Sequence, residues 1–216
     1  MIFINQYCHI QNRSLIRQGE IIFAAAGGTL DDFLEHAFQY MSLSYPKFYK
    51  MDRLSKLGFL ASEMLLKDTP LRPRYAPDQV ALVLSNAASS LDTDLRFAAS
   101  MKAIPSPALF VYTLPNIVAG EICIRQGLTG ENAFFVFPEF DAEQMADYVT
   151  LVMAFDSTAA CIAGWIDVMG DHHDVFLYLV EKERSASGVE HNPEQLHKIY
   201  KLNHGTIDNN AQKSDY

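Results

Sequence analysis

Residues 80–85 read Val80-Ala81-Leu82-Val83-Leu84-Ser85, a continuous apolar run bounded by polar residues. A strand that is apolar on both faces is typical of a parallel sheet covered by helices on both sides. The segment before this run supports that interpretation, because Pro70, Pro73 and Pro77 make residues 68–78 an irregular loop. The run therefore predicts a central strand of an α/β sheet.

Upstream of the loop, the sequence predicts a helix over residues 52–67. Asp52 is placed to cap its first turn, and apolar residues recur every three or four positions, at Leu54, Leu57, Leu60, Ala61, Met64 and Leu65. Further towards the N-terminus, residues 1–7 and 20–25 are predicted as short strands.

Downstream of the run, helical and strand-like patterns alternate. Helices are predicted over residues 91–101, 115–126 and 140–155, and strands over residues 133–137, 159–168 and 175–180. The last two strands are separated by a loop short enough for a hairpin, so we expect them to be antiparallel. This order predicts an α/β fold with a mixed central sheet and flanking helices.

Composition excludes several classes of protein. The 216 residues suit one domain, and 17 Lys and Arg against 26 Asp and Glu give a net charge of −9. This balance argues against a nucleic-acid binder and against a polybasic membrane anchor. No apolar run reaches the roughly 20 residues of a membrane-spanning helix, and the N-terminus does not resemble a signal peptide.

The cysteines indicate a reducing compartment. Cys8, Cys123 and Cys161 are odd in number and far apart, so they predict neither a disulfide framework nor a zinc site. We therefore expect a cytoplasmic protein.

The C-terminal residues differ from the rest in composition. We predict one domain over residues 1–182 and a polar, partly disordered tail over residues 183–216. Within that tail, residues 194–201 are expected to form a small helix, and residues 208–216 are expected to be frayed.

Three segments, in the family's order and spacing, resemble the β-ketoacyl synthases. Residues 106–130 contain Pro115-Asn116, Ala119-Gly120 and Gly127-Leu128-Thr129-Gly130, similar to the helix and turn that lead into the family's nucleophile strand. Met51-Asp52-Arg53 is similar to a helix start in that family, and residues 156–167 are similar to a later strand. The resemblance covers roughly residues 1–182, in particular with small ketosynthase-like proteins found with bacterial aryl-polyene genes.

The resemblance implies a thiolase-like fold of which this chain holds the N-terminal half. Members of the family have about twice this length and are built from two similar halves. We therefore expect this chain to lack the second half, which supplies the family's acid/base histidines.

The family's catalytic cysteine is replaced by Glu139. That cysteine stands nine residues after the second glycine of Gly-Leu-x-Gly, and counting from Gly130 gives Glu139. A carboxylate is a poor acyl carrier, because the mixed anhydride it would form is quickly hydrolysed. We therefore expect no catalytic residue. A helix-capping role for Glu139 is favoured by Asp141 and Glu143 in the same turn, while partner contact and base catalysis stay open.

Other polar candidates indicate neither a metal nor a cofactor. His172-His173, flanked by Asp171 and Asp174, could ligate a metal, but adjacent residues on a tight loop rarely point to one ion, so a solvated hairpin tip is favoured. Cys123 and Cys161 are expected to be inert core residues. The spacing of His191, His197 and His204 in the polar tail is not that of metal ligands. The loop of residues 85–90 lacks the glycines of a phosphate-binding loop.

In the resembled family, the strand matching residues 133–137 pairs across a dimer axis. Here all residues of that strand are apolar, and an apolar strand left uncovered at a sheet edge would promote aggregation. The residues are Ala133, Phe134, Phe135, Val136 and Phe137. We expect a homodimer through this strand, or a heterodimer with a full-length ketosynthase; an acyl carrier protein is considered as a further partner. The missing half is expected to uncover an apolar surface that includes Leu109, Phe110, Val111, Tyr112 and Phe140.

The expected function is a non-catalytic, ketosynthase-like partner, a pseudo-enzyme, in polyketide or fatty-acyl synthesis of the aryl-polyene type. The alternative is an acyltransferase or decarboxylase that depends on an acyl carrier protein and uses Glu139. A third hypothesis, that the protein is a small-ligand binding module, is supported only by the small-residue loop at residues 85–90.

Overall fold

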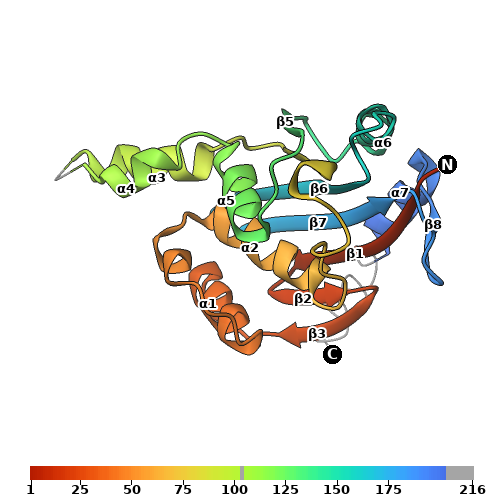
Figure 1. The fold of residues 1–216 in the computed structure, drawn as a ribbon. Helices are drawn as coiled ribbons and strands as arrows, with labels where there is room; N and C mark the ends of the chain where they lie inside the picture. The colour runs from red at the N-terminus through yellow and green to blue at the C-terminus, as the bar shows by residue number, and fades with distance from the viewer. Residues whose placement is uncertain (103–104, 203–216) are drawn as a thin grey trace.

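A computed structural model describes residues 1–102 and 105–202. It contains one eight-stranded mixed sheet with the order β3-β2-β1-β7-β6-β4-β5, and β8 pairs with β1 (Figure 1). The strands are β1 (Phe3–Gln11), β2 (Ser14–Arg17), β3 (Glu20–Ala24), β4 (Val80–Asn86), β5 (Asn132–Val136), β6 (Ala160–Met169), β7 (His172–Glu181) and β8 (Val189–Glu190).

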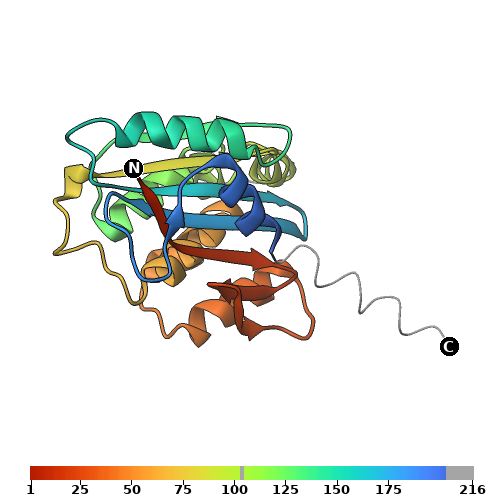
Figure 2. The same cartoon turned by 90° about the vertical axis from the view of Figure 1, so that its right-hand side faces the viewer.

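Helices cover both faces of this sheet. Helices α1 and α2 pack with α5 in one apolar core, and α6 packs with α7 in a second core on the opposite face (Figure 2). The helices are α1 (Leu30–Tyr40), α2 (Arg53–Leu66), α3 (Leu91–Ser100), α4 (Pro107–Val111), α5 (Ile117–Gln126), α6 (Ala142–Met153) and α7 (Pro193–Lys201), with 3-10 turns at Pro46–Lys50 and Pro77–Gln79.

The predicted central strand is confirmed as β4. All seven of its residues are buried, and it is parallel to both neighbours, β5 and β6. The predicted hairpin is also confirmed, because β6 and β7 are antiparallel from Ala160 opposite Glu181 to Met169 opposite His172. The mixed α/β architecture predicted from the sequence is therefore correct.

Local signals placed several helix ends correctly. Asp52 caps α2, and its Oδ1 accepts a hydrogen bond of 2.9 Å from the Ser55 N–H. Gly127 ends α5 with φ +67°, a left-handed conformation that glycine adopts without a steric penalty. These two residues fix the start of one helix and the end of another on the same face of the sheet.

Four elements were not predicted: α1, α4, β2 and β8. Helix α1 is the largest of these, and its sequence carries clear signals. Thr29 forms a capping box with Asp32. The buried residues of α1 recur at helical spacing: Leu30, Phe33, Leu34, Ala37 and Phe38.

The C-terminal segment continues the fold as far as it is described. Strand β8 pairs with β1, and α7 buries Leu196 and Ile199 in the second core. The domain boundary at residue 182 and the disorder of the tail stay predictions, and residues 208–216 lie outside the described residues. No helix within residues 1–102 and 105–202 is long and apolar enough to cross a membrane.

Candidate functional site

Glu139 lies in the loop between β5 and α6, where the resemblance places a nucleophile. Its side chain is exposed and forms no hydrogen bond or ion pair within the described part of the chain. The helix cap is Asp141 instead, because its Oδ1 accepts a 2.9 Å hydrogen bond from the Gln144 N–H. This bond lowers the pKa of Asp141. The capping role predicted for Glu139 is therefore wrong, and Asp141 fills it.

A cavity of about 560 Å³ opens at Glu139, between the first turns of α6 and α7. Its ionisable lining consists of four carboxylates and one histidine: Glu139, Asp141, Glu143, Glu194 and His197. Because the N-terminus of a helix carries partial positive charge, the helix dipoles of α6 and α7 stabilise the ionised form of these acids. Together they form an anionic site that attracts a cationic group and repels an anionic substrate.

Phe140, the next residue, points into the protein. It is buried, and its ring centroid lies 4.3 Å from that of Tyr200 and 5.5 Å from that of Phe176. The expectation that Phe140 belongs to an uncovered surface is therefore wrong. Its ring is held by α7 and β7 of the same chain.

The cysteine thiols do not offer a replacement nucleophile. Cys161 is fully buried in β6, and burial raises its pKa; burial also raises the pKa of Cys8 to about 12. Cys123 lies in α5 and is half-buried, and burial raises its pKa as well. A thiol with a raised pKa stays protonated at neutral pH and is a weak nucleophile. The prediction that Cys123 and Cys161 are unreactive agrees with this geometry.

The small-residue loop after β4 is bonded within the protein. One oxygen of Asp167 accepts hydrogen bonds from the Ala87 and Ala88 N–H groups, at 3.0 and 2.9 Å. Asn86 Oδ1 accepts a third from the Ser89 N–H at 3.0 Å. Because these donors already have acceptors, the loop does not present them to a ligand.

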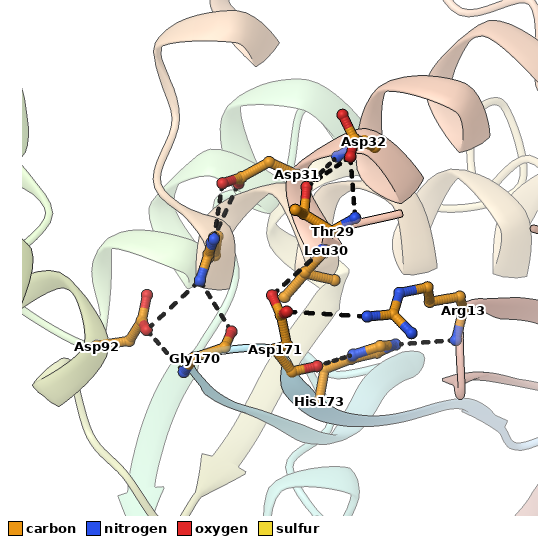
Figure 3. Close-up of polar contacts among 10 residues, drawn as sticks. Arg13, Thr29, Leu30, Asp31, Asp32, Asp92, Gly170, Asp171 and His173 are labelled. Carbon is orange, nitrogen blue, oxygen red and sulfur yellow. Dashed lines mark hydrogen bonds and ion pairs between the residues drawn. The ribbon is translucent and has the colours of Figure 1, made fainter. Parts of the chain in front are cut away.

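Arg53, in the segment similar to a ketosynthase helix start, joins three parts of the fold. Its guanidinium donates two hydrogen bonds to Asp31 and a third, of 2.9 Å, to the Gly170 carbonyl (Figure 3). The Gly170 N–H in turn donates to Asp92 Oδ1 at 2.9 Å. Residues of α1, α2 and α3 thus hold the turn between β6 and β7.

The same turn contains His172 and His173, which differ in environment. His172 is exposed, as a solvated hairpin tip requires, whereas His173 is 7% exposed. His173 Nε2 accepts from the Arg13 N–H at 3.3 Å, so its Nδ1 carries the proton and donates to the Asp171 carbonyl at 3.1 Å (Figure 3). The prediction of a solvated tip is therefore wrong for His173, whose pKa burial lowers. Within residues 1–102 and 105–202, no three His, Cys, Asp or Glu side chains gather to hold a metal ion.

Strand β5 is the last strand at one edge of the sheet. Its ladder to β4 begins with the Leu82 N–H donating to the Glu131 carbonyl and ends with the Phe137 N–H donating to the Asn86 carbonyl, both at 2.9 Å. In a β-strand, the backbone N–H and carbonyl of every second residue point to the same neighbouring strand, and those of the residues between them point to the opposite side. The backbone groups of residues 132, 134 and 136 therefore point to the open edge.

Exposed apolar side chains gather on α3, α4 and the segment after them, which project from the body as an arm (Figure 1). The members are Leu91, Leu95, Met101, Phe110, Val111 and Leu114. Phe110 and Val111 are exposed as predicted, and Leu109 is half-buried. Tyr112 is buried, contrary to prediction, and its hydroxyl donates to Glu121 Oε1 at 3.1 Å.

No protein-family model and no curated protein sequence matches the chain. Solved structures do resemble it. One, the ishigamide ketosynthase/chain length factor, superposes with a TM-score of 0.64 at 16% identity, over 86% of this chain and 63% of that chain. Another is a type II polyketide synthase acyl-carrier protein in complex with its ketosynthase bound to the hexaketide. It has a TM-score of 0.57 at 13% identity, over 84% of this chain and 62% of that chain.

A third structure is a ketosynthase in complex with its chain length factor from Xenorhabdus doucetiae. It has a TM-score of 0.55 at 11% identity, over 93% of this chain and 90% of that chain. This chain thus spans less than two thirds of the first two chains but matches nearly all of the third, which is of similar length. Identities this low establish the fold alone. The chain has the mixed α/β, thiolase-like fold of ketosynthases and chain length factors.

Proposed function

We propose that the chain is a non-catalytic ketosynthase-like subunit that pairs through β5 with a second chain of this fold. The observation that carries the proposal is the edge of β5, where backbone groups that have no partner within residues 1–102 and 105–202 lie among apolar side chains. Such an edge is a template for pairing with another strand. The process proposed is polyketide or fatty-acyl synthesis of the aryl-polyene type.

The outward groups define how two strands would pair. An antiparallel arrangement centred on Phe134 sets residue 132 opposite residue 136 of the partner chain. Each outward N–H and carbonyl then gains a hydrogen-bond partner. The partner is a full-length ketosynthase or a second copy of this chain. The ketosynthase is supported by the third structure above, in which a ketosynthase is bound to its chain length factor.

The absence of catalysis is supported by the environment of Glu139. A covalent acyl intermediate needs a nucleophile that is also a good leaving group, and a carboxylate does not provide both. The phosphate on the prosthetic arm of an acyl carrier protein would meet four carboxylates at this cavity. We therefore propose that a carrier protein, if it acts on the assembly, docks at the partner's site.

Two matched variants test the pairing. Val136 and Ile21 are 54% and 67% exposed and lie on the two opposite edge strands, β5 and β3. In light scattering, Val136→Lys should prevent assembly with itself or with a co-expressed full-length ketosynthase, whereas Ile21→Lys should assemble like the wild type. Equal assembly of both variants would exclude β5 as the interface, and the mass of the wild-type complex identifies the partner.

A further inference from the structure

A second cavity, of about 390 Å³, lies beside the C-terminal end of α2. Its apolar lining, called the floor below, consists of Met41, Leu43, Leu66, Pro70 and Leu71. Leu66 and Leu71 are only 5% and 4% exposed, so they are fixed in the core. The volume falls within the range of about 300–1,000 Å³ that is typical of small-molecule sites. This floor can accept a short hydrocarbon chain.

The rim of this cavity is polar and carries an excess of positive charge. Its one acid, Glu63, is already neutralised by Arg125, whose Nε and terminal nitrogen donate hydrogen bonds of 2.9 and 2.7 Å. Gln126 donates a third, of 2.7 Å, to the same carboxylate. Glu63 therefore has little capacity left to attract a cation.

The two cations of the rim are Lys67 and Arg72. Neither forms an ion pair with a carboxylate within residues 1–102 and 105–202; Arg72 donates a 2.6 Å hydrogen bond to the Gly127 carbonyl, a neutral acceptor. Both side chains are exposed and lie on either side of Leu71 in the sequence. The cavity therefore combines an apolar lining with two cations that have no ion-pair partner in the described part of the chain, although the net charge of the protein is −9.

We propose that this cavity binds a medium-chain carboxylate, with its hydrocarbon chain on the floor and its carboxylate between Lys67 and Arg72. Charge-assisted hydrogen bonds to the head group and burial of the chain both contribute to binding. A cationic head group of the same length is repelled, and a neutral one loses the ionic contacts. None of the lining residues belongs to β5, α3 or α4, so the proposal is independent of the pairing proposed above.

Calorimetric titration of the full chain with octanoate tests this site. Octanoate should bind the wild type, and Lys67→Glu should weaken binding by roughly tenfold or more, the loss expected for one charge-assisted contact. Lys182→Glu makes the same charge change at an exposed position outside the cavity, and it should leave the affinity unchanged. Octylammonium should not bind, and 1-octanol should bind more weakly than octanoate.

A second variant tests the floor without changing charge. Leu43→Trp should fill part of the cavity and weaken octanoate binding, with an unchanged circular dichroism spectrum showing that the chain is folded. The proposal is overturned if octanoate does not bind the wild type, if Lys67→Glu and Lys182→Glu bind it equally well, or if octylammonium binds as tightly as octanoate.

Discussion

Arg53 binds Asp31 through two parallel hydrogen bonds, Nε to Oδ1 at 3.1 Å and a terminal nitrogen to Oδ2 at 2.7 Å. This bidentate geometry links the first turn of α2 to the first turn of α1, and the Arg53 side chain is only 16% exposed. The hydrogen bonds from Arg53 lower the pKa of the Asp31 carboxyl. Since Arg53 also reaches the Gly170 carbonyl, one side chain joins two helices and a hairpin turn.

Arg53→Ala should therefore destabilise the protein by roughly 1–3 kcal/mol, because it leaves Asp31 and the Gly170 carbonyl without this donor. Lys198→Ala provides the control, since Lys198 is an exposed cation on α7 that forms no ion pair within residues 1–102 and 105–202. Its effect should stay within about 0.5 kcal/mol. Urea unfolding of both variants measures the difference, and equal stabilities would show that the Arg53 contacts contribute nothing.

Val136→Pro should prevent pairing through β5 while preserving the ladder to β4. The Val136 N–H points to the open edge, so proline removes a donor that the isolated chain does not use. The complex measured by light scattering should dissociate to single chains without loss of folded structure. An unchanged complex mass would exclude this strand.

Phe135→Asp should have a broader effect than Val136→Pro. Phe135 packs on the opposite side of β5 from the first core, with its ring 5.6 Å from that of Phe137 and 4.6 Å from that of Tyr148. A charge placed there is desolvated without a partner. The variant should be monomeric or insoluble, and a soluble dimer of unchanged mass would contradict the proposed contact.

Glu139 and Asp141 should differ in their effects on stability. Asp141→Ala removes the cap of α6 and should cost about 1 kcal/mol, whereas Glu139→Gln should stay well within that amount. The pKa of Asp141 is lowered in the folded protein, so its contribution is present above pH 4 or so and is lost as the pH falls through the folded pKa. Chemical denaturation at pH 7 measures both variants. If Glu139→Gln stayed folded but abolished a measured acyl turnover, the catalytic alternative would be favoured.

Local sequence signals predicted much of this fold because they act over a few residues. Helix α2, the buried strand β4 and the β6–β7 hairpin follow from the Asp52 cap, a continuous apolar run and a short loop. Strand β2 was not predicted, because four residues are too few to show the alternation of apolar and polar residues that marks a strand. Its conformation also depends on pairing with β1, which the local sequence does not reveal. Helix α1 was missed although its capping box and buried periodicity are readable in residues 29–38.

The candidate site was less predictable, because it depends on contacts between residues distant in sequence. Nothing near Phe140 shows that Tyr200 of α7 covers its ring. Nothing near His173 shows that the Arg13 N–H will bond to it. Similarly, the cap of α6 was assigned to Glu139 rather than Asp141 because both acids lie before the same helix. Only the backbone geometry separates them.

His191 provides a final test, based on a buried histidine in the C-terminal segment. It is 7% exposed, neither ring nitrogen has a hydrogen-bond partner in the described part of the chain, and its ring stacks on Tyr178 at 6.0 Å. Burial disfavours the charged form and lowers the pKa of His191 to about 4, against 6.5 for an ordinary histidine. The folded state therefore holds His191 neutral at a pH where the unfolded chain takes up a proton.

The sign of the pH effect follows from this difference. The stability contributed by neutral His191 is fully present above pH 6.5, falls as the pH decreases towards 4, and is constant below that value. Between pH 7 and pH 5 the free energy of unfolding should decrease by roughly 2 kcal/mol because of this histidine.

His191→Gln removes the titrating imidazole, so urea unfolding at the two pH values should show a smaller decrease in the free energy of unfolding than in the wild type. His197→Gln, an exposed histidine of α7, should retain the wild-type decrease. If His191→Gln also retained it, the acid sensitivity would have to come from other groups, such as His173, whose pKa is lowered by burial in the same direction.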